Sequence, residues 1–150
     1  MNFDINKSLE ELEDTKWKES DFQSNLILKC QELRKKKLKD FTIEDLRIMI
    51  GQKIGLKYLV PLALETLVTN PFVEGDLFMG DLLEQVLKVD KGFWNENEDL
   101  LFELNEIISL VKSTIKQLHP LSKTTNYLRE VVLLIQLTGA LIEDGVPMGL

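Results

Sequence analysis

An apolar repeat with helical spacing runs through the last third of the chain and limits the folds that the chain can adopt. Hydrophobic side chains recur every three or four residues, at Leu100, Leu101, Leu104, Ile107, Ile108, Val111, Ile115 and Leu118. This spacing places all of them on one face of an α-helix, whereas a half-buried strand needs strict alternation of apolar and polar residues. We therefore predict a long helix near residues 97–118 whose apolar face packs against the rest of the protein.

Signals that start and stop helices divide the remaining sequence into shorter helical segments. Ser8 and Thr42 each precede an acidic residue three positions later, which is the pattern of a capping box. Ser24 is a further N-cap candidate, because its hydroxyl can accept a hydrogen bond from the first helical turn. Pro61 suits the first turn of a helix, where its missing N–H is not needed, and Gly55 is expected to end the helix before it.

A second long segment, near residues 124–143, is apolar nearly all round from Val131 to Ile142. A helix of this kind belongs in the middle of a bundle. It is too short to cross a membrane, which takes about 20 apolar residues. No segment requires a strand, and a chain of 150 residues favours one domain. The sequence thus predicts an all-α, single-domain bundle of about six to seven helices over residues 1–150.

The composition is that of a folded acidic protein. Hydrophobic residues make up 44% of the chain, which is enough for a core, and 25 acidic against 18 basic residues give a net charge of −7. An acidic surface repels nucleic acid and anionic membranes, so neither is expected as the partner. A single cysteine, Cys30, excludes an internal disulfide and is typical of a reducing compartment. We expect a cytoplasmic protein, since no apolar run opens the sequence.

Few side chains in the sequence point to catalysis or metal binding. The one histidine, His119, falls at the expected end of a helix, where it can pair with free carbonyls. One histidine and one cysteine cannot supply the usual zinc ligands. Asn95, Asn97 and Asp99 alternate as in a calcium loop, but Leu100 stands where that loop needs glycine. We expect no enzymatic activity, no cofactor and no metal.

The net charge is distributed unevenly along the chain. Residues 61–110 hold eleven acids and two lysines, a net charge of −9, whereas residues 29–60 hold nine bases and four acids, a net charge of +5. The basic run at residues 34–39 has no interleaved aromatic residues and is interpreted as a solvated helix end. If the fold keeps these segments apart, the surface is polarised; if the charges scatter, they serve solubility.

Three stretches, which follow one another along the chain, resemble the sequences of a known family. They are K-S-L-E-E-L-E at 7–13 with Trp17, F-T-I-E-D-L-R-I-M-I-G-Q-K-I-G-L-K-Y-L-V-P-L-A-L-E-T-L at 41–67, and N-P-F-V-E-G-D-L-F-M-G-D-L-L-E-Q-V-L at 70–87 with Phe93-Trp94. Over residues 7–94 the chain resembles a family of contact-dependent growth inhibition (CDI) immunity proteins. The resemblance implies a small helical protein that binds the toxic C-terminal domain of a large effector delivered by neighbouring bacteria.

The resemblance suggests a function for the segment of net charge −9, residues 61–110. Toxins of such systems are often nucleases with basic clefts, which an acidic inhibitor can occupy. The cognate toxin C-terminal domain is then the partner, with a basic nuclease as one version of it. The candidates for toxin contact are five acids of the −9 segment, Glu74, Asp76, Asp81, Glu84 and Asp90. Asp45, Arg47 and Glu65 are expected to be structural, with Arg47 and Glu65 pairing with nearby charges.

A function from another class stays open on the sequence. The chain could be a helical adaptor or regulatory protein that dimerises through the apolar face of residues 127–142, and the sequence does not set the oligomeric state. Gene order separates the two readings, because an immunity gene lies just downstream of a gene for a large secreted protein.

Overall fold

The structure is a computed structural model that describes residues 1–18, 21 and 24–118. This part of the chain contains seven α-helices and one 3-10 helix: α1 Leu9–Glu13, α2 Asn25–Lys35, η1 Leu38–Asp40, α3 Ile43–Gly51, α4 Leu56–Thr69, α5 Asp81–Leu87, α6 Lys91–Glu96 and α7 Glu98–Leu118. No strand occurs in it, apart from two isolated bridges. The all-α class and the long helix near 97–118 are confirmed. The helix predicted near 124–143 lies outside the described residues, and one domain over residues 1–150 stays a prediction.

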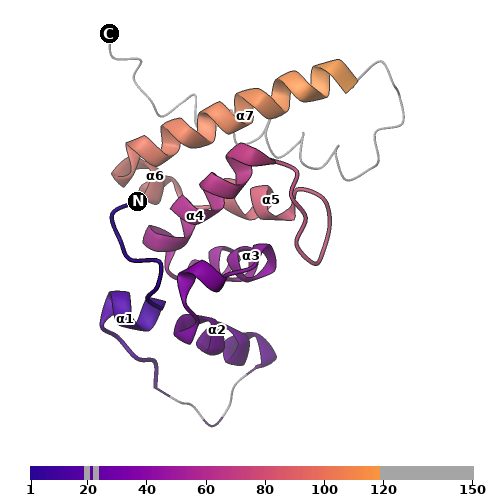
Figure 1. Ribbon diagram of the computed structural model, residues 1–150. Helices are drawn as coiled ribbons and strands as arrows, with labels where there is room; N and C mark the ends of the chain where they lie inside the picture. The colour runs from indigo at the N-terminus through magenta and orange to yellow at the C-terminus, as the bar shows by residue number, and fades with distance from the viewer. Residues whose placement is uncertain (19–20, 22–23, 119–150) are drawn as a thin grey trace.

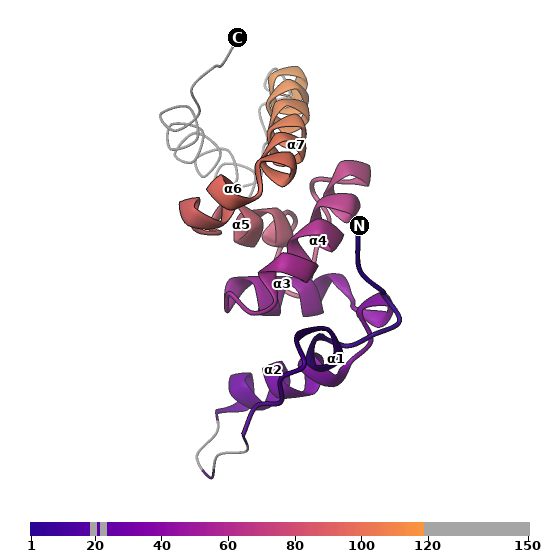
Figure 2. The same ribbon diagram turned by 90° about the vertical axis from the view of Figure 1, so that its left-hand side faces the viewer.

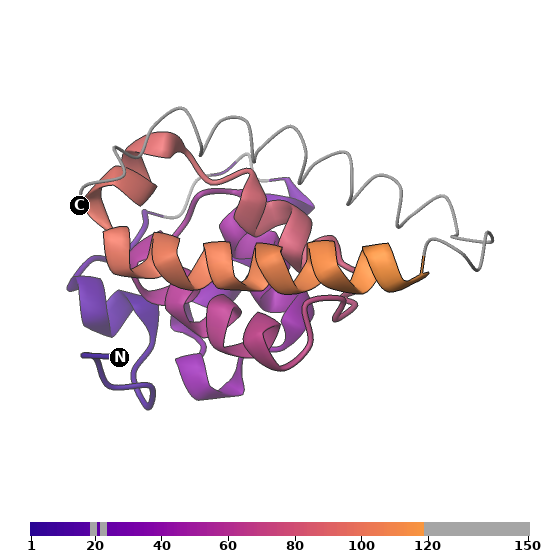
Figure 3. The ribbon, with the colours of Figure 1, turned by 90° about the horizontal axis from the view of Figure 1, so that it is seen from above.

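The helices form a stack that follows the order of the chain (Figure 1). α1 packs on α2, α2 on α3, and α3 on both α4 and α5. α7 packs on α4 and α6 at the far end, and it crosses over the other helices when seen from above (Figure 3). Figure 2 shows the same succession from the side. The stack therefore places the −9 segment at the α7 end and the +5 segment in the layers below it.

The core lies where α3, α4, α5 and α7 meet. The side chains of Leu59, Leu64, Leu83 and Leu104 are completely buried there. The apolar face predicted for α7 is confirmed, because Leu101, Leu104, Ile107, Ile108 and Val111 are buried and Leu100 and Ile115 are partly buried. Packing of this face, more than helix propensity, holds a helix such as α7 in place.

The predicted caps are confirmed. The Ser8 hydroxyl accepts a hydrogen bond from the Glu11 N–H, and the Glu11 carboxylate accepts one from the Ser8 N–H at 2.7 Å. Thr42 and Asp45 form the same reciprocal pair at the start of α3. The Ser24 hydroxyl caps α2 by accepting from the backbone three residues later. These bonds satisfy N–H groups that have no partner within the helix.

The predicted start of a helix at Pro61 is wrong. α3 ends at Gly51, and α4 begins at Leu56, so Pro61 lies inside α4. Gly55 allows the early start because it adopts a φ of 63°, in the left-handed region that favours glycine. A Cβ on Gly55 would also lie 2.8 Å from Cδ1 of Leu9. Inside α4, Pro61 has no N–H to donate to the carbonyl four residues earlier.

The prediction that the basic run is a solvated helix end is wrong for Arg34, which is only 2% exposed. Its guanidinium donates to Glu13 at 2.5 Å and to the Thr15 carbonyl at 2.8 Å. The same group lies 4.8 Å from the centre of the Trp17 ring. Arg34 therefore ties α2 to the end of α1, which the spacing along the chain did not reveal.

A candidate toxin-binding surface

The loop between α4 and α5 carries two of the predicted contact residues. An isolated antiparallel bridge between Glu74 and Met79 closes this loop, and the Gly80 N–H donates to the Val73 carbonyl at 3.2 Å. Figure 1 shows the loop projecting beside α5. Gly80, with a φ of 87°, leads directly into α5. We call residues 74–80 the acidic loop.

Asp81 lies beneath the acidic loop and not on the surface. Its side chain has no exposed area. Its carboxylate accepts backbone hydrogen bonds from Gly75 at 2.7 Å, Leu77 at 3.1 Å and Phe78 at 3.4 Å. The prediction that Asp81 contacts the toxin is therefore corrected, because this carboxylate is used to hold the loop in shape.

A second carboxylate fastens the acidic loop to α3. Glu44 accepts two hydrogen bonds from the Arg47 guanidinium, at 2.7 and 2.5 Å, and one from the Asp76 N–H at 2.9 Å. Arg47 also lies 3.8 Å from Asp81, so the prediction that it pairs with a nearby acid is confirmed. The hydrogen bonds from Arg47 are the main cause that lowers the pKa of Glu44 below its usual value of 4.5.

Asp45 is structural, as expected. Its side chain is 7% exposed and pairs with Lys36 at 2.6 Å. Burial acts to raise the pKa of Asp45, but the hydrogen bonds from Lys36 and from the Thr42 N–H outweigh it, so the pKa lies below its usual value. Asp45 thereby joins the start of α3 to the residue that follows α2.

The structure brings Glu74 and Asp76 together on the exposed side of the acidic loop. With Glu44 and Asp45 they line a surface depression of about 490 Å³, which Lys29 borders. Since Glu44 is paired with Arg47 and Asp45 with Lys36, the carboxylates left for a partner are those of Glu74 and Asp76.

The other two predicted contact residues are separate from this depression. Glu84 forms an ion pair with Lys88 at 2.9 Å, and Asp90 forms one with Lys53 at 3.1 Å. Asp90 follows the C-terminal end of α5, whereas the acidic loop precedes its N-terminal end. A helix of seven residues separates the two by about 10 Å, at about 1.5 Å per residue.

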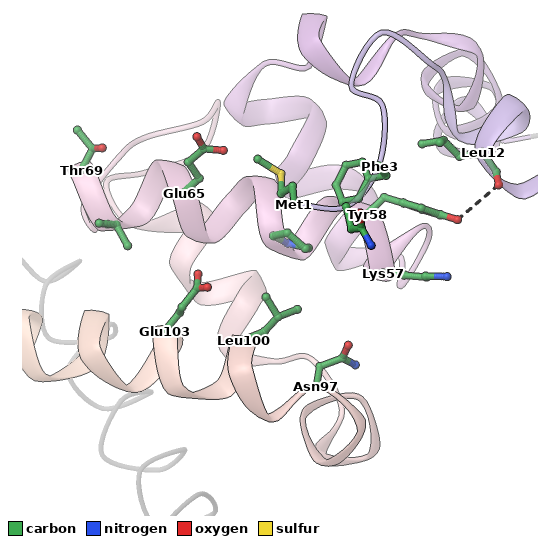
Figure 4. A pocket seen from close by; sticks show the side chains of 13 residues that line it. Met1, Phe3, Leu12, Lys57, Tyr58, Glu65, Thr69, Asn97, Leu100 and Glu103 are labelled. Atoms are coloured by element: carbon green, nitrogen blue, oxygen red, sulfur yellow. Dashed lines mark hydrogen bonds between the residues drawn. The ribbon is translucent and has the colours of Figure 1, made fainter.

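A larger groove lies between α4, α7 and the N-terminal residues (Figure 4). Its volume is about 1000 Å³. The lining residues are Met1, Asn2, Phe3, Leu12, Lys57, Tyr58, Pro61, Glu65, Val68, Thr69, Asn97, Leu100 and Glu103. The sequence reasoning missed this groove, because it forms only when α7 packs on α4. Glu65, which was expected to pair with a nearby charge, is exposed and forms no ion pair with the described residues, so that pairing stays a prediction.

The comparison with known families decides what kind of protein this is. The sequence model of the CDI immunity proteins matches residues 11–104, which is more than half of the chain. The chain belongs to the CDI immunity proteins. The match runs from α1 into α7 and so includes both the acidic loop and most of the groove. Among curated proteins and among solved structures, no match was found.

Membership in the family gives this immunity protein a toxin as its partner in general. Within residues 1–18, 21 and 24–118, no group of three or more His, Cys, Asp and Glu side chains is placed to hold a metal ion. None of the helices described here is both long and apolar enough to cross a membrane. His119 and the apolar face of residues 127–142 lie outside the described residues.

Proposed function

We propose that this immunity protein binds the C-terminal toxin domain of its cognate CDI effector in the cytoplasm and neutralises it stoichiometrically with an acidic surface. The observation that carries the proposal is the family match over residues 11–104. The toxin domain is the part of such an effector that harms the recipient, so protection requires that this part be blocked.

Action by binding, without catalysis, agrees with the chemistry of the described residues. Cys30 is 2% exposed, and burial raises the pKa of its thiol. A buried thiol with a raised pKa is a poor nucleophile, because the thiolate is the reactive form.

The acidic character of the surface supports a basic partner, for which a nuclease is the proposed class. A nuclease cleft is basic because it holds phosphates, and a protein of net charge −7 is attracted to it over a long range. The acidic loop is already fixed by Asp81 and Glu44 before any partner arrives. Binding through Glu74 and Asp76 therefore carries little cost of ordering the loop.

Co-expression with the toxin domain encoded next to this chain tests the proposal. We expect growth to be rescued and a complex of one toxin domain with one immunity protein to co-purify, measured by size-exclusion chromatography with light scattering. Growth arrest that persists at equal expression, with no complex recovered, would contradict the proposal.

A charge-reversal variant tests the acidic loop. In E74K/D76K we expect binding to weaken about tenfold, because two carboxylates that face the partner become repulsive. The helical circular dichroism should be unchanged, since both side chains are exposed. The matched control is D21K/D40K, which changes the net charge equally at exposed residues that line neither the depression nor the groove. If both variants bind alike, the acidic loop is not the contact.

A further inference from the structure

Two acids that have no ion pair among the described residues, Glu65 and Glu103, line the groove between α4 and α7. We propose that this groove is the docking site for a segment of the toxin that presents an arginine or lysine flanked by apolar side chains. The inference rests on the proposed function and adds to it a second contact surface and the chemistry that the surface selects.

Two helices supply the walls of the groove. On α4, Tyr58, Pro61, Glu65 and Val68 line it at spacings of three and four residues, so they share one face of the helix. At the start of α7, Asn97, which directly precedes the helix, and Leu100 and Glu103 within it line the groove at spacings of three. A volume of about 1000 Å³ accommodates several side chains of a partner, since pockets for small ligands span roughly 300–1000 Å³.

Two carboxylates of the groove, those of Glu65 and Glu103, are open to a cation of the partner. Figure 4 shows Glu103 extending from α7 toward α4, which carries Glu65. Neither carboxylate forms an ion pair within 4.0 Å among the described residues, whereas Glu84 and Asp90 each do. Lys57 lines the groove near the N-terminal end of α4, and its Nζ lies 5.5 Å from the centre of the Tyr58 ring. The α-ammonium of Met1 also lines the groove, so the two cations equal the two carboxylates in number, but among the described residues neither cation lies within 4.0 Å of Glu65 or Glu103.

The apolar lining explains why the cation is flanked by apolar side chains. Val68 is 57% exposed and Met1 is 65% exposed, so both leave apolar surface open to the groove. A partner that covers this surface also removes water from Glu65 and Glu103, which strengthens their attraction for a cation. Arginine or lysine suits this setting because its long aliphatic stem packs on apolar surface while its charge reaches a carboxylate.

The groove is formed before a partner binds. Phe3 packs edge-to-face on Tyr58 with ring centres 5.2 Å apart, and the Tyr58 hydroxyl donates to the Leu12 carbonyl at 3.4 Å. Behind the groove, the buried Leu64 and Leu104 belong to the core that joins α4 to α7. A preformed site loses little conformational entropy on binding, which favours a specific docking contact.

The variant E65K/E103K tests the charge of the groove. Its affinity for the toxin domain encoded next to this chain would be measured by surface plasmon resonance, with D21K/D40K as the control of equal charge. We expect the Kd of E65K/E103K to rise at least about 30-fold, and that of D21K/D40K to change less than about threefold. Equal changes in the two variants would overturn the inference, because charge at any position would then suffice.

A neutral variant tests the shape of the groove. Val68→Trp places a large side chain at an exposed position inside the groove, and Leu26→Trp does the same at an exposed position on α2 outside it. We expect V68W to weaken binding by at least about tenfold and L26W to leave it unchanged, with the melting temperatures of both close to wild type. Wild-type affinity of V68W would overturn the inference.

The wild-type arm of the same experiment separates this inference from the proposed function. If the wild-type protein binds the toxin domain but E65K/E103K and V68W bind equally well, the groove is not the docking site and the proposed function stands. If the wild-type protein does not bind at all, the proposed function fails and the inference fails with it.

Discussion

Asp81 fixes the acidic loop through three backbone hydrogen bonds to a carboxylate that has no exposed surface. In Asp81→Asn, one acceptor oxygen is replaced by an amide that donates, so at least one of the three N–H groups loses its acceptor. We expect the free energy of unfolding to fall by about 2–3 kcal/mol, the cost of leaving such groups unsatisfied next to a lost charge. Urea unfolding followed by circular dichroism measures this change. In Asp76→Asn, on the exposed side of the same loop, the change should stay below about 0.5 kcal/mol; equal effects would show that burial does not matter here.

Gly75 and Gly92 differ in the space that surrounds them. A Cβ at Gly75 would lie 2.7 Å from the Glu44 carboxylate and 3.0 Å from that of Asp81, whereas nothing lies within 4 Å of a Cβ at Gly92. We therefore expect Gly75→Ala to lower the free energy of unfolding by about 1–2 kcal/mol. Gly92→Ala, inside α6, should raise it by about 0.5–1 kcal/mol, because alanine loses less backbone freedom in a helix. Thermal unfolding of G75A and G92A measures both changes in stability. Destabilisation by G92A would contradict the argument.

At the scale of the element, the start of α3 should be sensitive to acid. The pKa values of Glu44 and Asp45 lie below their usual 4.5 and 3.8 in the folded protein. Carboxyl groups whose pKa is lowered by folding stabilise the fold at neutral pH. This stabilisation is lost as the pH falls through the pKa values that the groups have in the folded protein. We expect the free energy of unfolding to decline as the pH falls below about 5. In Glu44→Gln this decline should be smaller, and in Glu106→Gln, an exposed position on α7, it should match wild type. An equally steep decline in E44Q would contradict the assignment.

The helices themselves were predictable because their signals are local. Capping boxes depend on residues three positions apart, and the face of α7 depends on residues three or four apart. Pro61 was misplaced because α4 starts directly after Gly55, and the left-handed conformation of Gly55 and its close approach to Leu9 are visible only in the fold. Asp81 was misassigned for a similar reason: acids in a loop are usually solvated, and only the fold shows that three N–H groups converge on this one.

At the scale of the whole molecule, the order of the helices in the stack places the acidic and the basic segment in different layers. Because neighbouring layers follow one another in sequence, the segment of net charge −9 lies at the α7 end and that of +5 in the layers below it (Figure 2). The five predicted acids do not form one patch, since Asp81 is buried and Asp90 is separate from the acidic loop. The fold provides an acidic end at α7 that contains the groove, and an acidic loop that lies against α3 beside Lys29 of α2. Attraction to a basic partner therefore depends on acids in two places and not on a single cluster.

This arrangement predicts how association with the toxin depends on salt. Charges more than about 8 Å apart are screened at physiological ionic strength, so an attraction spread over one end of the molecule weakens as salt is added. We expect the association rate constant of the wild-type protein to fall by about tenfold or more between low and high salt, with a smaller change in the dissociation rate. Because E65K/E103K removes charge from the acidic end, its association rate should depend less steeply on salt than that of D21K/D40K, which has the same net charge. Stopped-flow measurements over a series of salt concentrations give these slopes. Equal slopes for the two variants would mean that net charge alone steers the encounter, and that the position of the acids in the stack has no effect on it.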